Sequence, residues 1–150
     1  MMSSYLIFQL GGRLFGAKLL GAIEILSWRK PRPVPLSYPY VEGLIDYRGT
    51  VYPVFNLYRR LGLSRPGPIG FTAQKKTEPA GAGLSIILLE ANKIPFGIIV
   101  DGVAKMAFLE EAPIEPGKAH SVDPQFIRGI AFEDEQEILI LDFERLFNAN

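Results

Sequence analysis

Short apolar runs separated by polar turns extend along most of the chain. One run ends at Gly11-Gly12-Arg13 and another at Ala91-Asn92-Lys93, and each turn is followed by a second run that contains Phe-Gly. Apolar runs joined by a short polar turn are typical of β-hairpins. The stretch GLIDYRGTVYPVFNL (residues 43–57) shows the same pattern, with apolar residues alternating on both sides of Arg48-Gly49. The pattern predicts a mostly β protein whose short strands form two small barrels or sandwiches.

Two blocks of sequence occur twice, in the same order. YLIFQLGGRLFGAKLLGAIEIL (residues 5–26) aligns without a gap on IILLEANKIPFGIIVDGVAKMA (residues 86–107), and their apolar positions match. YVEGLI (residues 40–45) returns in the same way as FIRGIA (residues 126–131). Two matching blocks in one order indicate an internal duplication.

The duplication divides the chain into two related halves, about 5–63 and 86–148, joined by the linker 64–85. The linker is rich in Gly, Pro and Ala, and its roughly 20 residues exceed the usual length of a loop inside a compact domain. We expect one domain, 1–150, in which each half forms its own barrel. On superposition two pairs of glycines should coincide: Gly16 with Gly97, and Gly43 with Gly129.

Local signals add a few short elements to this picture. Asn56 and Asp142 occupy equivalent positions, and each would serve as the N-cap of a short helix. The segment 26–39 carries four of the twelve prolines and should be extended or turning. Pro39–Gly43 and its counterpart Pro124–Gly129 are each compatible with one helical turn that ends at glycine.

Composition excludes several classes of protein. The chain has 150 residues, 48% of them hydrophobic, which fits a globular protein with a real core. Its 16 basic and 16 acidic residues leave no basic excess for nucleic acid. The lack of cysteine excludes disulfides and cysteine-based metal sites and suits a reducing cytoplasm. No apolar stretch approaches the ~18 residues of a membrane span, and the N-terminus does not match a signal peptide. We expect a cytoplasmic protein that is not inserted in the membrane.

Residues able to do chemistry are few. His120 lies alone in a polar loop, whereas metal sites and catalytic triads need partners for it. Glu110-Glu111 and Glu133-Asp134-Glu135 are typical of solvated turns and not of a buried acid–base pair. Glycine-rich phosphate motifs are also missing. The sequence therefore predicts no enzyme, no cofactor and no metal.

Three charged residues stand out in apolar surroundings, namely Glu24, Asp46 and Arg48. The simplest interpretation is a hairpin turn with a solvated arginine and an outward-facing glutamate. The alternative is a recognition site, in which a charge-assisted bond from Glu24, or failing that Asp46, would hold the guanidinium fork of Arg48.

The order of these motifs resembles the CheW-like adaptor family of bacterial chemotaxis. The resemblance covers about residues 4–148, is weakest in the linker, and is most specific in EGLIDYRGTVYPVFNL and GIIVDGV. It implies two five-stranded SH3-like β-barrel subdomains without catalytic activity. It also implies a scaffold that couples the cytoplasmic tips of methyl-accepting chemoreceptors to the regulatory domain of a CheA-type histidine kinase, at membrane-associated receptor arrays.

The resemblance further implies a receptor contact in an apolar groove between the subdomains. The positions that match this groove are Leu6, Leu19, Ala22, Val103 and Ile140. Glu24 and Arg48 match a Glu and an Arg near the groove, and Asp46 stands where the family usually has Asn. Since an ionised Asp only accepts hydrogen bonds, Asp46 suits a changed partner preference or a local pair with Arg48. A small β-barrel that binds a ligand between its halves is the alternative function, and it would need a pocket with convergent polar groups.

Overall fold

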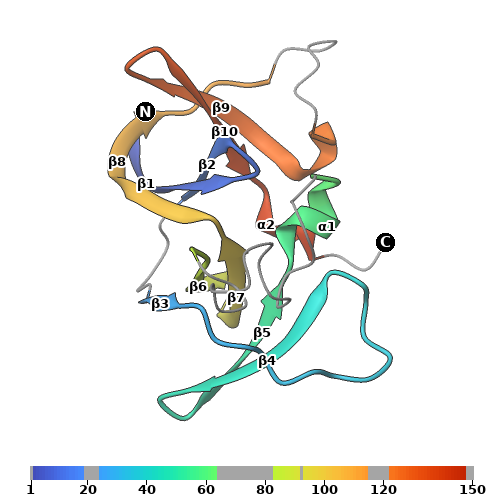
Figure 1. Ribbon diagram of the computed structural model, residues 1–150. Coiled ribbons are helices and arrows are strands. Elements are labelled where there is room, and N and C mark those ends of the chain that lie inside the picture. Colours follow the sequence, from blue (N-terminus) through green and yellow to red (C-terminus); the bar gives the residue numbers. More distant parts are fainter. Residues whose placement is uncertain (1, 19–23, 64–82, 92, 115–121, 148–150) are drawn as a thin grey trace.

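The chain folds into two five-stranded sheets, seen in the upper and lower parts of Figure 1. The computed structural model describes residues 2–18, 24–63, 83–91, 93–114 and 122–147. Sheet A has the strand order β8 (Gly102–Glu110), β1 (Met2–Leu10), β2 (Arg13–Lys18), β10 (Gln136–Leu141) and β9 (Ile127–Glu133). Sheet B has the order β3 (Glu24–Ser27), β6 (Ser85–Ala91), β7 (Ile94–Val100), β5 (Thr50–Phe55) and β4 (Val41–Tyr47). The predicted class, mostly β with two five-stranded units, is confirmed.

Each sheet curls until its two edge strands approach each other. In sheet A, the segment after β8 meets β9 through the isolated bridge Ala112–Ile130, with N···O distances of 2.8 Å in both directions. In sheet B, the segment after β3 meets β4 through the bridge Arg32–Leu44, at 2.8 and 2.9 Å. We call the curled sheets barrel A and barrel B, and the gap between the two edge strands of each barrel its seam. Backbone hydrogen bonds thus close one end of each seam.

The two barrels exchange strands between the halves of the chain. Barrel A combines the first hairpin, β1–β2, with the last three strands, whereas barrel B combines β3, β4 and β5 with the second hairpin, β6–β7. The prediction that each half forms its own barrel is therefore wrong. Both copies of the repeat have the same apolar pattern, so the sequence does not show which half a hairpin completes. The boundaries of the two halves stay a prediction.

Equivalent glycines lie where the exchanged strands meet. β2 pairs in parallel with β10 where Gly16 lies beside Ile140, and β7 pairs in parallel with β5 where Gly97 lies beside Val54. A Cβ at Gly16 would lie 2.8 Å from Cδ1 of Ile140, and one at Gly97 would lie 3.4 Å from Cγ2 of Val54. The close approach of neighbouring strands explains both glycines.

Short helices follow β5 and β10. The helix α1 (Leu57–Leu61) begins after Asn56, whose side chain accepts a hydrogen bond at 3.2 Å from the backbone N–H three residues on. The helix α2 (Phe143–Leu146) begins in the same way after Asp142, with a hydrogen bond of 3.3 Å. Both predicted N-caps are confirmed, because each side chain satisfies one of the free N–H groups of the first turn.

The two predicted helical turns have different outcomes. The 3-10 helix η1 (Pro124–Phe126) confirms the prediction for Pro124–Gly129. In Pro39–Gly43 the prediction is wrong, because a turn at 39–40 leads directly into β4, where pairing with β5 imposes an extended backbone. The proline-rich segment that precedes this turn is extended or turning, as predicted.

Apolar side chains form a core inside each barrel and a larger cluster between the barrels. The cluster between the barrels, which we call the junction cluster, draws on both sheets and both helices. Its members include Leu6, Phe8, Phe15, Ile87, Phe96, Ile98, Leu57 and Leu146. Burial of this much apolar surface holds the two barrels together as one unit.

Candidate functional site

The residues that match the family's receptor groove do not all lie on an open surface. Leu6 is 1% exposed and faces the junction cluster, and Ile140 is 0% exposed and faces Gly16 inside barrel A. Both side chains are therefore buried in this conformation, and a role for these two residues in receptor binding stays a prediction. Leu19 and Ala22 lie outside the described residues.

Val103 lies where barrel A meets the junction cluster. It stands near the start of β8, opposite Phe8 of β1, and its partly buried side chain packs against that cluster. This position is compatible with a contact between the barrels, and a role for Val103 in receptor binding stays a prediction.

Glu24 and Arg48 lie on opposite sides of the seam of barrel B. Arg48 occupies the turn between β4 and β5 with a φ of 49°, and Glu24 is the first residue of β3. The Nη1 atom of Arg48 is 3.8 Å from Oε1 of Glu24, and 76% of the Arg48 side chain is exposed. Its guanidinium carbon lies 5.3 Å from the ring centre of Tyr47. The partner of Arg48 is therefore Glu24, at a distance that leaves much of the guanidinium group open to solvent.

Asp46 does not pair with Arg48. Its Oδ2 atom lies 3.0 Å from Nη1 of Arg32, and both side chains of this pair are more than half exposed. Arg32 reaches Asp46 because its own backbone forms the bridge to Leu44, two residues before Asp46 on β4. Of the two predicted arrangements, the structure has the one in which Arg48 pairs with Glu24.

Arg32 was not predicted from the sequence as part of this site. Two prolines flank it in the segment KPRP, and this signal indicated only an extended backbone. Nothing in the local pattern connects Arg32 with Asp46, 14 residues further on. The contact exists only because the segment after β3 crosses β4 at this point.

The seam of barrel A carries an ion pair with reversed polarity. Lys105 is the repeat equivalent of Glu24, and its Nζ atom lies 2.5 Å from Oε1 of Glu133. This hydrogen bond raises the pKa of the Lys105 ammonium group above its usual value. Glu133 directly precedes Asp134, the equivalent of Arg48. An ion pair across the seam is thus common to both barrels, and the Lys105–Glu133 pair has the opposite polarity to the Glu24–Arg48 pair.

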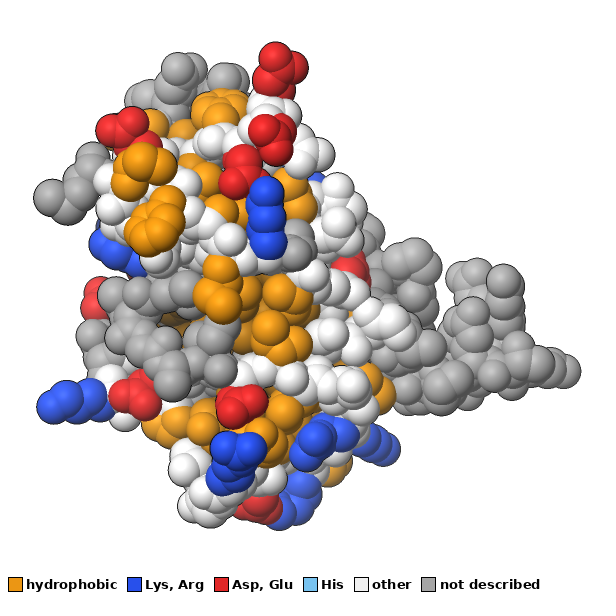
Figure 2. All heavy atoms as spheres, turned by 90° about the vertical axis from the view of Figure 1, so that its left-hand side faces the viewer, with side chains coloured by type: hydrophobic (Ala, Val, Ile, Leu, Met, Phe, Trp, Pro, Cys, Tyr) orange, Lys and Arg blue, Asp and Glu red, His pale blue; other side chains and the backbone are white. Residues whose placement is uncertain are grey.

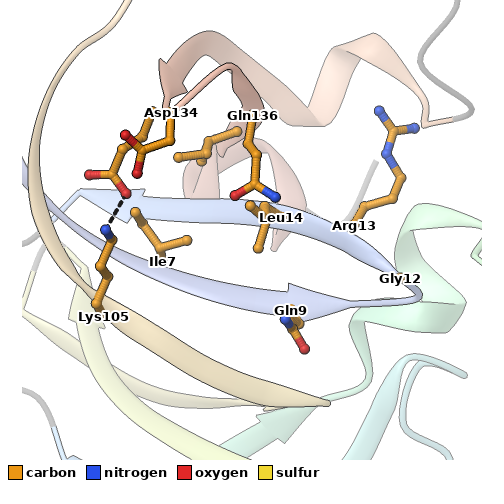
Figure 3. A pocket seen from close by; sticks show the side chains of 10 residues that line it. Ile7, Gln9, Gly12, Arg13, Leu14, Lys105, Asp134 and Gln136 are labelled. Atoms are coloured by element: carbon orange, nitrogen blue, oxygen red, sulfur yellow. Dashed lines mark ion pairs between the residues drawn. The ribbon is translucent and has the colours of Figure 1, made fainter.

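A concavity of about 350 Å³ opens at the seam of barrel A (Figure 3). Ile7, Leu14 and Ile138 contribute its apolar wall, and polar side chains of the β9–β10 turn lie above it. A second concavity, of about 380 Å³, lies between the barrels beside Lys18 and Phe143.

Ion pairs within the protein neutralise several charged groups around these concavities. Figure 3 shows Lys105 turned towards the β9–β10 turn, where it pairs with Glu133. Arg13 lies 3.4 Å from Glu137, and Arg128 of the second concavity lies 3.0 Å from Glu111. Across the described ranges, no group of three or more His, Asp or Glu residues could hold a metal ion. The concavities therefore offer few convergent charges to orient a small ligand, which argues against the alternative function.

Exposed apolar residues lie beside the seam of barrel B. Ile25 follows Glu24 on β3, Val51 pairs with Asp46 across the hairpin, and both side chains are exposed. Figure 2 shows this side of the molecule, where basic and acidic side chains surround hydrophobic ones at the lower end. Apolar surface bordered by charge is typical of a site for another protein.

The described part of the molecule is thus a two-barrel β protein whose distinctive features are an exposed charged seam and the apolar surface beside it. Within the described ranges, no helix has both the length and the hydropathy needed to cross a bilayer.

Comparison with known proteins identifies the family. Residues 4–150 match the model of the CheW-like domain, so the chain belongs to the CheW-like family. Chemotaxis protein CheW of Treponema pallidum (strain Nichols) is 28% identical over 144 residues, which cover 95% of this chain and 80% of that protein. A probable chemotaxis protein CheW of Rhizobium etli is 29% identical over 143 residues, with coverages of 94% and 84%. The crystal structure of scaffolding protein TtCheW from Thermoanaerobacter tengcongensis has a TM-score of 0.81 at 26% identity, and the match covers 100% of this chain and 95% of that one.

Proposed function

We propose that this protein is a non-enzymatic scaffold that couples the cytoplasmic tips of methyl-accepting chemoreceptors to the regulatory domain of a CheA-type histidine kinase. The observation that carries the proposal is the exposed pair of Arg48 and Glu24 on the seam of barrel B, in a chain of the CheW-like family. Relatives named as chemotaxis proteins and a similar structure named as a scaffolding protein support this class of function. Recruitment to receptor arrays on the cytoplasmic side of the membrane follows from these partners.

The internal symmetry of the fold supports a role in recognition for the charges of barrel B. Barrel A has the same strand order and the same kind of backbone bridge at its seam. It carries Phe132 at the position equivalent to Asp46, and Asp134 at the position equivalent to Arg48. Because a barrel closes with either set of residues, closure does not require Asp46 or Arg48. Selection for binding is the better explanation of Arg48.

The chemistry of barrel B favours an acidic partner surface. Among the described residues, barrel B with α1 and its loops has seven basic and four acidic side chains, whereas the rest of the molecule has five basic and ten acidic ones. The guanidinium group of Arg48 has N–H donors left for a carboxylate, which it can bind in a bidentate fork. Ile25 and Val51 would add apolar contact around that ion pair.

Binding of two purified probes tests the proposal. The probes are the regulatory domain of a CheA-type kinase and the cytoplasmic tip hairpin of a chemoreceptor, both from the same genome. Arg48→Ala should weaken at least one interaction about tenfold, which corresponds to ~1.4 kcal/mol. Its melting temperature should stay nearly unchanged, because exposed ion pairs are worth ~0–1 kcal/mol. Arg48→Lys should restore binding only partly, because lysine keeps the charge but not the planar fork.

Two further variants, a second test and a control, accompany this measurement. Val103→Glu should weaken receptor binding if the contact reaches the junction of the barrels, because it would bury an unpaired charge there. Arg29→Ala removes an exposed arginine from the segment after β3 and serves as the matched control. If Arg48→Ala binds both probes as tightly as the parent protein, the proposed role of the seam is wrong.

A further inference from the structure

We propose that Arg32 is a positioning residue that holds Asp46 away from Arg48 and so keeps Arg48 available to a carboxylate of the partner. The inference rests on the proposed function, in which Arg48 takes part in binding. It assigns a role to a residue of the proline-rich segment that lies outside the groove and outside the β4–β5 turn.

The backbone of Arg32 is fixed against β4. Its N–H donates to the carbonyl of Leu44 at 2.8 Å, and its carbonyl accepts from the N–H of Leu44 at 2.9 Å. Prolines on both sides of Arg32 restrict the backbone further. Gly43 permits this approach, because a Cβ there would lie 2.7 Å from the carbonyl carbon of Arg32. The Arg32 side chain therefore starts from a fixed point close to Asp46.

If it were unpaired, Asp46 would compete with a carboxylate of the partner for the guanidinium group of Arg48. Asp46 is the last residue but one of β4, and Arg48 follows two positions later in the β4–β5 turn, so a free Asp46 carboxylate would be the nearest acidic group along the chain to the long Arg48 side chain. Asp46 pairs with Arg32 instead, whose Nη1 atom lies 3.0 Å from its Oδ2 atom. The Arg48–Glu24 pair is longer, at 3.8 Å. Because Asp46 is paired with Arg32, Arg48 has only the long contact to Glu24 among the described carboxylates, and 76% of its side chain stays exposed.

A carboxylate within the chain opposes binding of a carboxylate on the partner. If Asp46 were released, it could pair with Arg48, and that pair would have to break before the partner could bind. Arg32 thus acts on binding through Asp46, without touching the partner. Barrel A has Ala112 and Phe132 at the corresponding bridge and strand positions, so the arrangement belongs to the seam with the exposed arginine.

A double-mutant cycle tests this role. Affinities for the kinase regulatory domain and the receptor tip hairpin are measured for Arg32→Ala, for Asp46→Asn and for the double variant. Arg32→Ala should weaken binding about three- to fivefold, in line with an exposed pair. Adding Asp46→Asn to Arg32→Ala should restore the affinity to within about twofold of the parent, because the freed carboxylate is gone. Arg32→Lys, which keeps a cation near Asp46, should retain most of the affinity.

Lys30→Ala is the matched control, because Lys30 carries the same charge as Arg32 in the same exposed segment and makes no ion pair with Asp46 among the described residues. The inference is overturned if the double variant binds as weakly as Arg32→Ala, or if Lys30→Ala costs as much. If Arg48→Ala weakens binding and Arg32→Ala does not, the inference fails while the proposed function stands. If Arg48→Ala has no effect, both fail. Thermal unfolding of each variant checks that the fold is unchanged.

Discussion

Asp101 shows at the scale of one residue how the two barrels are joined. It lies between β7 of barrel B and β8 of barrel A. Its Oδ2 atom accepts a hydrogen bond of 2.8 Å from the N–H of Gly11, and its own N–H donates to the carbonyl of Gln9 at 2.9 Å. Burial raises the pKa of the Asp101 carboxyl group above its usual value of 3.8. The turn between β1 and β2 is thus tied to the crossover between the barrels by a carboxylate that is partly removed from water.

This environment predicts a pH-dependent effect of Asp101→Asn. A raised pKa means that the folded state binds the proton more tightly than the unfolded state. Ionisation of Asp101 therefore lowers the stability of the folded protein at pH values above the pKa of the folded state, and this loss disappears as the pH falls through that pKa. The amide oxygen of Asn can still accept from Gly11. We expect Asp101→Asn to raise the free energy of unfolding at pH 7 by less than about 1 kcal/mol, because the carboxylate is still partly solvated.

Urea denaturation at pH 7 and at pH 4.5 measures this effect. The advantage of Asp101→Asn over the parent protein should shrink at the lower pH. Glu90→Gln, at an exposed carboxylate of β6, serves as the control and should change little at either pH. An advantage that stays constant or grows on acidification would contradict the assignment.

At the scale of the element, the seam of barrel B depends on how closely one segment can approach β4. Gly43 has a φ of 151°, and a side chain there would meet the carbonyl group of Arg32, which is backbone and cannot turn aside. Gly129 has the corresponding role in barrel A, where a Cβ would lie 2.8 Å from the carbonyl oxygen of Ala112. The proline-rich segment can therefore close the barrel only over a glycine.

Gly43→Ala should accordingly destabilise the protein by about 2–4 kcal/mol, because it adds a backbone clash to an unfavourable φ. Gly12→Ala is the matched control, since Gly12 has a φ of 78° but nothing within 4 Å of the added Cβ. It should cost only about 1 kcal/mol, the strain of the backbone alone. Both values can be measured by chemical denaturation, and equal costs would show that the approach of Arg32 does not constrain Gly43.

At the scale of the whole molecule, Arg60 of α1 links the two halves of the chain. Its guanidinium carbon lies 4.6 Å from the ring centre of Tyr40 and 4.8 Å from that of Phe126, which are equivalent positions of the repeat. Its Nε donates to the carbonyl of Leu146 at 2.7 Å, and Leu146 is the repeat equivalent of Arg60 itself. One arginine therefore contacts matching positions from both halves.

Arg60→Ala should lower the free energy of unfolding by about 1–2 kcal/mol, through loss of the cation–π contacts and of the hydrogen bond to Leu146. Arg59→Ala is the control on the neighbouring residue, which is exposed and donates to the carbonyl of Pro39 in the same half of the chain. It should change stability by less than about 0.5 kcal/mol. Thermal melts of both variants give the comparison, and equal shifts would mean that Arg60 contributes no more than a surface arginine.

Much of the local structure could be predicted from the sequence, because it depends on neighbours along the chain. The apolar runs and polar turns indicated the hairpins, and Asn56 and Asp142 cap their helices through N–H groups only three residues away. The candidate pair of Glu24 and Arg48 was also visible, since both charges stand in apolar surroundings. The sequence could not reveal that Leu6 and Ile140 face inwards, because either face of such apolar strands can be the buried one.

The β class, the internal repeat, the helix caps and membership of the CheW-like family can all be read from the sequence, because they rest on the order and spacing of residues. The exchange of hairpins between the halves depends on the three-dimensional packing, because both copies offer the same complementary pattern and the choice between them depends on how the junction cluster packs. The pairing of Asp46 with Arg32 depends on packing in the same way, because that contact arises where the chain crosses itself at Gly43. Contacts between distant segments depend on which surfaces pack together, and a local pattern does not contain that information.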